Sequence, residues 1–181
     1  MIPMGSQGHI TLVLAFSLLL FFNSFPLTNA STELVEGICN QTIDYANCLK
    51  ALESDSRTPK TSHLKDLAKI ALELAIANTT ESKAYIDVLL AKNCTAPLKV
   101  CSYRYLLVVG SFQSALQELE SDVKVASYDT RIAGEDADYC EKALVSAGVQ
   151  VPSISTRNSY AKLYSSIGSE ITDKLSYNKR L

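Results

Sequence analysis

Apolar residues recur at spacings of three and four along most of the chain beyond residue 60, which is the pattern of amphipathic helices that bury one face. Four long helices are predicted, over residues 61–92, 95–120, 126–146 and 152–175. Thr61 or Ser62 is expected to cap the first helix, and Gly148 to close the third. Pro97 falls in the first turn of the second helix, where proline is favoured.

The second helix has the most regular apolar stripe. Tyr103 and Tyr105 lie about 200° apart on a helix, so only one of them can face the core. In the first helix, the polar stretch from Asn78 to Ser82 interrupts the pattern, and a bend or an exit from the core is expected there. The stripe of the second helix comprises Leu98, Cys101, Tyr105, Val108, Phe112, Ala115 and Leu119.

Two shorter helical pieces precede these helices. They cover residues 32–39 and 45–52, are separated by a polar turn, and are followed by a loop over residues 54–60. Long helices joined by short loops favour an all-α, up-down-up-down four-helix bundle. The expected organisation is an N-terminal helical hairpin and loop over residues 31–60, and the bundle over residues 61–181.

The first thirty residues differ in character from the rest. The apolar run from Ile10 to Phe22 is too short to cross a bilayer, which needs roughly 20 apolar residues. It is followed by Thr28-Asn29-Ala30, which fits a signal-peptidase site. A signal peptide over residues 1–30 is therefore expected, and with it a secreted protein.

Composition and charge narrow the function classes. The chain has 17 basic and 19 acidic residues, a net charge of −2, which argues against nucleic acid or an acidic membrane as partner. Beyond residue 30 the sole histidine is His63, at a helix start. Metal-binding motifs and a glycine-rich phosphate loop are absent from the sequence, so no catalytic site, metal or cofactor is expected. Carboxylates cluster at Glu118/Glu120 and Glu135/Asp136/Asp138, as on many solvated helix faces.

All five cysteines lie beyond the signal peptide: Cys39, Cys48, Cys94, Cys101 and Cys140. In a secreted chain, two disulfides and one free thiol are the default, which five cysteines can arrange in 15 ways (five unpaired choices, three pairings each). Cys94 and Cys101 would stand roughly 10 Å apart on one continuous helix, which disfavours that pair without excluding it. A helical hairpin would bring Cys39 and Cys48 together.

Three N-glycosylation motifs fit the same compartment. They are Asn40-Gln41-Thr42, Asn78-Thr79-Thr80 and Asn93-Cys94-Thr95.

The cysteine segments resemble those of the plant invertase and pectin methylesterase inhibitor family. Ile38-Cys39, Tyr45-Ala46-Asn47-Cys48 and Leu52 resemble the start of that family. Leu98 through Tyr105, with a tyrosine four residues after Cys101, is similar to its third-cysteine motif, and Ala133 through Glu141 to its fourth. The resemblance extends over nearly all of residues 33–175.

This resemblance implies bridges Cys39–Cys48 and Cys101–Cys140, with Cys94 as a free thiol, and a four-helix bundle with an N-terminal hairpin. It also implies a function, namely a secreted inhibitor whose non-covalent complex occludes the active-site cleft of acid invertase or pectin methylesterase. The target enzyme is then the partner, in the cell wall or apoplast, with the vacuole as an alternative destination.

The segment from Cys48 to Arg57 is more similar to the invertase branch and its pollen-allergen relatives. Invertase inhibitors of the family place Pro-Lys-Phe in the loop between the second and third bundle helices, and that loop enters the sucrose pocket. The matching positions here, after Asp122, are Val123, Lys124 and Val125, so the lysine is kept and the other two residues are replaced. Residues 122–125 are the expected inhibitory loop. Methylesterase inhibition and a helical carrier or storage role are the alternatives.

Overall fold

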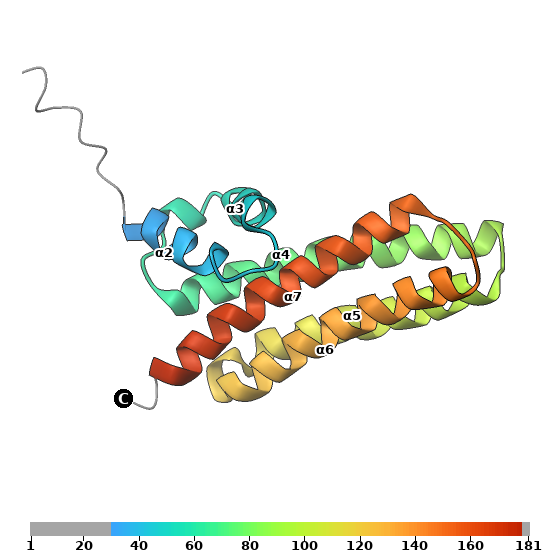
Figure 1. Ribbon diagram of the computed structural model, residues 1–181. Coiled ribbons are helices and arrows are strands. Elements are labelled where there is room, and N and C mark those ends of the chain that lie inside the picture. The colour runs from blue at the N-terminus through green and yellow to red at the C-terminus, as the bar shows by residue number, and fades with distance from the viewer. Residues whose placement is uncertain (1–29, 179–181) are drawn as a thin grey trace, which may run out of the picture.

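The structure, a computed structural model, describes residues 30–178. All regular elements of that part are helices (Figure 1). They are α2 (Ala30–Cys39), α3 (Tyr45–Glu53), a 3-10 turn η1 (Thr58–Lys60), α4 (Leu64–Lys92), α5 (Ala96–Ser121), α6 (Val123–Ser146) and α7 (Pro152–Asn178). The expected signal peptide lies, apart from Ala30, outside the described residues. Within residues 30–178 no helix is long and apolar enough to span a membrane.

Helices α4, α5, α6 and α7 form the body of the molecule. They run alternately up and down, each packs on the next, and α7 returns to pack on α4 (Figure 1). Their lengths of 24 to 29 residues make them roughly 36–44 Å long. The predicted all-α, up-down-up-down bundle is confirmed.

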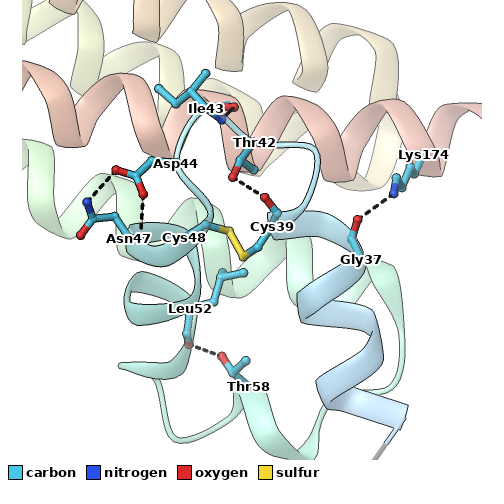
Figure 2. The surroundings of a disulfide bond; sticks show 11 residues. Gly37, Cys39, Thr42, Ile43, Asp44, Asn47, Cys48, Leu52, Thr58 and Lys174 are labelled. Atoms are coloured by element: carbon cyan, nitrogen blue, oxygen red, sulfur yellow. Dashed lines mark hydrogen bonds between the residues drawn. A yellow bond between two sulfur atoms is a disulfide. The ribbon is translucent and has the colours of Figure 1, made fainter.

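Helices α2 and α3 form a hairpin that packs across one end of α4 and α7 (Figure 1). Figure 2 shows the disulfide Cys39–Cys48 at its centre, with a Cα–Cα distance of 5.5 Å. The hairpin is attached to α7 by two hydrogen bonds. The backbone N–H of Ile43 donates to Oγ of Ser166 (3.2 Å), and Nζ of Lys174 donates to the carbonyl of Gly37 (3.3 Å). These contacts fix the hairpin against the bundle.

The core consists of two clusters of buried side chains. One joins the hairpin to the neighbouring half of the bundle and contains Leu52, Phe112 and Ile171. The other surrounds the disulfide Cys101–Cys140 towards the far end. The stripe predicted for α5 is confirmed, because all seven of its residues are buried. Tyr105 is completely buried, whereas the side chain of Tyr103 is 58% exposed.

Two helix starts differ from the expectation. The residue that caps α4 is His63, not Thr61 or Ser62, and it makes no hydrogen bond through its side chain. Helix α6 begins at Val123, three residues before the apolar periodicity resumes at Ala126. The end of α6 follows the prediction, since Gly148 has a φ of 64° and its N–H donates to the carbonyl of Val145 (3.0 Å).

The polar stretch of α4 remains in the core, contrary to expectation. Helix α4 continues without interruption through residues 78–82, and the side chains of Thr79 and Ser82 are fully buried. Their hydroxyls donate to backbone carbonyls one turn earlier, from Thr79 to Ala75 (2.7 Å) and from Ser82 to Asn78 (2.8 Å). Because these bonds satisfy the hydroxyl groups locally, burial costs little and no bend is required.

Candidate functional site

A single residue, Asp122, connects α5 to α6. Its backbone is extended (φ −139°, ψ 93°), and its Oδ1 accepts hydrogen bonds from the backbone N–H groups of Lys124 (3.0 Å) and Val125 (3.3 Å). Asp122 is therefore the N-cap of α6. The expectation that Val123, Lys124 and Val125 form a loop is wrong, because the cap places all three in the first turn of the helix.

Within this turn Lys124 is the exposed charge. Val123 is half-buried and Val125 is 40% exposed, so the lysine stands between two aliphatic side chains at the end of the bundle. None of the ion pairs found within residues 30–178 includes Lys124. Lys124 is thus exposed and its ammonium group makes no ion pair that would have to be broken on binding.

The position of Lys124 is unfavourable for the helix itself. The N-terminus of a helix carries the positive end of its dipole, which favours acidic side chains and disfavours a lysine by typically 0.3–1 kcal/mol. Asp122 offsets this effect with its carboxylate. A lysine at this position contributes nothing evident to folding, which makes it a candidate for recognition.

Helices α5 and α6 are braced near the end of the bundle opposite Asp122. The disulfide Cys101–Cys140 joins them with a Cα–Cα distance of 4.4 Å. One turn further along α5, Nη1 of Arg104 donates to Oδ1 of Asp136 (2.8 Å), a nearly buried carboxylate. The guanidinium carbon of Arg104 also lies 4.3 Å from the centre of the Tyr139 ring. The two helices are therefore tied together at that end, whereas the Asp122 turn is held by its own capping hydrogen bonds.

A second exposed surface lies on α6. Tyr128 and Tyr139 are eleven residues apart, which is three helical turns, and they share one side of the helix. Their side chains are 62% and 49% exposed. Arg131, between them, pairs with Asp173 of α7. This broad face combines aromatic and charged groups, as protein interfaces commonly do.

The surface hollows do not resemble a carrier's binding cavity. One of about 710 Å³ lies between α2, the start of α4 and the end of α7, and its lining includes Glu33, Asp173 and Lys174. Another of about 600 Å³ lies between α6 and α7 and is lined by Glu135, Lys142 and other charged residues. Both hollows are lined by charged residues, which do not suit an apolar ligand. Neither therefore supports the alternative that the protein is a carrier.

The residues considered for catalysis are dispersed. His63 is exposed at the start of α4. Glu118 and Glu120 lie in the last turns of α5, while Asp136 is engaged by Arg104 and Asp138 by Lys142 and Lys162. Within the described residues no group of three His, Cys, Asp or Glu side chains is placed to hold a metal ion.

The cysteines form the pairs that the family resemblance implies, Cys39–Cys48 and Cys101–Cys140, and Cys94 is free and exposed in the short connection between α4 and α5. Sequence reasoning missed two features of the site. One is the capping role of Asp122, which its residue type could have indicated. The other is the Arg104–Asp136 pair, for which two charges 32 residues apart give no sequence signal.

Comparisons with known proteins point to one family. The family model described as plant invertase/pectin methylesterase inhibitor matches residues 33–169. A cell wall/vacuolar inhibitor of fructosidase from Arabidopsis thaliana is 30% identical over 124 residues, which are 62% of this chain and 66% of the relative. A pectinesterase inhibitor from Actinidia deliciosa is 28% identical over 142 residues, 76% of each chain.

Two solved structures share the fold. One is a mutant form of a pectin methylesterase inhibitor from Arabidopsis, which superposes with a TM-score of 0.69 at 21% identity and covers 78% of this chain and 95% of its own. The other is a pectin methylesterase inhibitor from Arabidopsis thaliana, with a TM-score of 0.59 at 20% identity, covering 77% and 93%.

Proposed function

The chain belongs to the plant invertase/pectin methylesterase inhibitor family, and on that premise we propose that it inhibits a plant carbohydrate-active enzyme by occluding its active-site cleft. The complex is non-covalent, and the chain itself is not a catalyst. Of the two target classes, acid invertase is favoured. The single observation that supports this choice is Lys124, an unpaired lysine whose backbone N–H is held by Asp122. The sequence resemblance matches its position to the Pro-Lys-Phe tripeptide of invertase inhibitors.

In this proposal the first turn of α6 is the part that enters the enzyme. Asp122 holds the backbone of Lys124 and Val125 in place, so the turn loses little conformational freedom on binding. The ammonium group of Lys124 supplies hydrogen-bond donors for the polar groups of a sugar-binding pocket. Val125 adds an apolar contact next to it.

Methylesterase inhibition is the second candidate, and the aromatic face of α6 favours it. An enzyme with a long, shallow polysaccharide cleft would be covered by a helical surface rather than by one turn. Tyr128, Tyr139 and the charges beside them provide such a surface, with the mixed character of an interface. Standard interfaces bury about 1,200–2,000 Å² in total, so binding through this face should not depend on the Asp122 turn alone.

We also propose that the protein is secreted to the cell wall or apoplast, with the vacuole as the alternative. The apolar segment before Ala30 supports passage through the secretory pathway. Two buried disulfides are typical of an oxidising compartment.

The decisive experiment titrates the purified protein against acid invertase and pectin methylesterase separately, between about pH 4.5 and 7, since carboxylates begin to protonate at the acid end of this range. Inhibition of invertase alone supports the favoured target. Inhibition of methylesterase alone, weakened by excess pectin and by Tyr128→Ala or Tyr139→Ala, supports the second candidate. Inhibition of neither enzyme contradicts the proposal.

The first prediction concerns Lys124 and assumes that invertase is the target. Lys124→Ala should raise the inhibition constant at least tenfold, which corresponds to about 1.4 kcal/mol. Lys99→Ala is the matched control, because Lys99 is an exposed lysine near the start of α5, at the opposite end of the bundle. It should leave the inhibition constant unchanged.

Two further substitutions in the same turn are expected to strengthen inhibition rather than weaken it. Val123 is the first residue of α6, where proline is favoured, and Val125 is exposed enough to accept phenylalanine. Val123→Pro combined with Val125→Phe should tighten inhibition. If Lys124→Ala has no effect on an invertase that is still inhibited, the contact lies elsewhere on the molecule.

A further inference from the structure

The three N-glycosylation motifs are presented very differently by the fold. Asn40 is exposed immediately after the last residue of α2. Asn93 is exposed as the residue that ends α4. Asn78 lies in the middle of α4 and is half-buried, and its Oδ1 is completely covered and has no hydrogen-bond partner. The same sequence pattern thus occurs at two open positions and at one position inside a helix–helix contact.

The half-buried side chain of Asn78 lies against the contact between two helices. Asn78 lies one turn before Ser82, on the side of α4 that faces α7, because Nη1 of Arg157 donates to Oγ of Ser82 (3.2 Å). The next residue, Thr79, is fully buried. A glycan attached to Nδ2 during synthesis would begin beside the contact between α4 and α7, so we expect it to hinder closure of the bundle.

Asn93, in contrast, lies in the short exposed connection between α4 and α5. Only Asn93, Cys94 and Thr95 separate α4 from α5. The N–H of Thr95 donates to the carbonyl of Asn93 (2.8 Å), which tightens the connection and leaves the Asn93 and Cys94 side chains on the outside. Cys94 is the free cysteine of the described part of the chain. An exposed thiol therefore adjoins an exposed glycosylation acceptor.

A free thiol on a secreted protein is exposed to disulfide exchange. Its thiolate attacks one sulfur of a small disulfide such as oxidised glutathione; a new S–S bond forms at Cys94, the old S–S bond breaks, and one glutathione leaves as a thiolate. Access to the attacking thiol is one of the factors that set the rate of this step. A bulky, hydrophilic group on the neighbouring residue, whose Cα lies only about 3.8 Å away, would restrict that access.

We propose that Asn93 carries an N-linked glycan that covers the Cys94 thiol and protects it from disulfide exchange, and that Asn78 carries none. Asn40 is the second glycosylated position. The inference rests on the proposed passage through the secretory pathway, but not on the identity of the target enzyme. Asn93 and Lys124 lie at opposite ends of α5, whose 26 residues span roughly 39 Å. The glycan therefore leaves the proposed inhibitory turn free.

Glycan occupancy is measured on protein secreted from plant cells. Enzymatic removal of N-glycans converts each glycosylated asparagine to aspartate, and peptide mass spectrometry locates the conversion. Conversion is expected at Asn40 and Asn93 and not at Asn78. A glycan at Asn40 with Asn93 unmodified overturns the proposal while the secretory route stands. Unmodified asparagines at all three positions also overturn the proposal, absence of the protein from the secreted fraction overturns the secretory route, and a glycan at Asn78 overturns the argument from burial.

Protection of the thiol is measured as the rate at which oxidised glutathione adds to Cys94 in the folded protein. Asn93→Gln and Thr95→Val each remove the glycosylation motif. In each variant Cys94 should react at least tenfold faster than in the glycosylated protein of the original sequence. Thr95→Val removes only a buried hydroxyl that has no hydrogen-bond partner, so its effect on folding should be small.

Thr95→Ser keeps the motif, and Asn40→Gln removes the distant glycan, so both are matched controls that should react at the original slow rate. Cys94→Ser should not react. Equal rates for Asn93→Gln and the glycosylated protein overturn the protective role. Inhibition of the target enzyme, measured in parallel, should be the same for all these variants.

Discussion

At the scale of single residues, Asp122 links the fold to the proposed contact. Its side chain caps α6 and at the same time fixes the backbone of Lys124, the residue proposed to bind the enzyme. Loss of an N-cap residue typically costs about 1 kcal/mol. A change at Asp122 should therefore appear both in stability and in inhibition, although its side chain is not itself proposed to contact the enzyme.

Asp122→Ala should lower the free energy of unfolding by about 1 kcal/mol and weaken inhibition, because the first turn of α6 frays. Asp122→Asn keeps an oxygen acceptor for the two N–H groups and should retain most of both properties. The measurements are denaturant unfolding and enzyme titration on the same preparations. An Asn variant as impaired as the Ala variant would mean that the charge of Asp122, not its hydrogen bonds, is what matters.

Helix starts show why residue-level prediction succeeded only in part. The apolar periodicity indicates a beginning near Ala126, whereas the backbone hydrogen bonds to Asp122 begin the helix at Val123. For α4, Thr61 and Ser62 are the residue types that usually cap, yet His63 takes that position without a side-chain bond. Periodicity identifies which residues are buried, but capping is decided by backbone geometry that several neighbouring polar residues could satisfy.

At the scale of helices, α6 and α7 approach each other through two glycines. A Cβ on Gly134 would lie 2.8 Å from Cβ of Ser165 and nearer still to its Oγ, and a Cβ on Gly168 would lie 2.6 Å from Cγ2 of Thr130. Each glycine thus accommodates a side chain from the other helix. The close approach makes both positions intolerant of even one added methyl group.

Gly134→Ala and Gly168→Ala should each destabilise the protein by about 1–2 kcal/mol, since overpacking typically costs 1–3 kcal/mol and the better helix propensity of alanine returns part of it. Gly110 is the matched control, because it is exposed in the middle of α5 and an added Cβ meets nothing within 4 Å. Gly110→Ala should stabilise by up to about 1 kcal/mol. Thermal or denaturant unfolding distinguishes the two classes, and a stabilised Gly134→Ala would contradict the close packing.

The helices themselves could be predicted because their apolar stripes are regular, as for the seven buried residues of α5. Polar core residues could not, since Thr79 and Ser82 look like an interruption until their hydroxyls are seen to bond within the helix. The ion pair between Arg104 and Asp136 could not be predicted either. Which helices become neighbours determines such pairs, and a single sequence does not specify the neighbours of an individual charge.

At the scale of the whole molecule, several carboxylates are stabilised in their charged form. Hydrogen bonds from the side chain and backbone of Arg57 lower the pKa of Asp55 to about 2. The hydrogen bond from Lys142, helped by Lys162, lowers the pKa of Asp138 against the effect of burial. For Asp87, burial acts to raise the pKa, but hydrogen bonds from Lys83 and Ser102 outweigh it and the net shift is downward.

These shifts predict how stability depends on pH. A carboxyl whose pKa is lower in the folded state stabilises the protein above its unfolded pKa of about 3.9, and this contribution is lost as the pH falls through the folded value. The contribution of these carboxyls to the free energy of unfolding should therefore stay constant between about pH 5 and 7, and should be lost from about pH 4 towards pH 2. The carboxyls concerned are those of Asp55, Asp87 and Asp138. The protein therefore keeps these ion pairs at a mildly acidic pH of about 5.

Thermal unfolding midpoints measured from about pH 2 to 7 test this, with Asp55→Asn as the variant. Its midpoint should fall less steeply below about pH 4 than that of the original sequence, because one of the titrating groups is gone. An identical slope in the two proteins would show that Asp55 does not contribute.

The two disulfides also determine what a proteolytic cut would do. Each bridge joins helices that are consecutive in the chain, α2 to α3 and α5 to α6, and neither links the hairpin to the bundle. A nick after Lys124 would leave two fragments covalently tied through Cys101–Cys140, and the nicked inhibitor would migrate as one chain until reduced. A nick within residues 54–60 would leave the hairpin attached by non-covalent contacts alone, free to dissociate as a separate peptide.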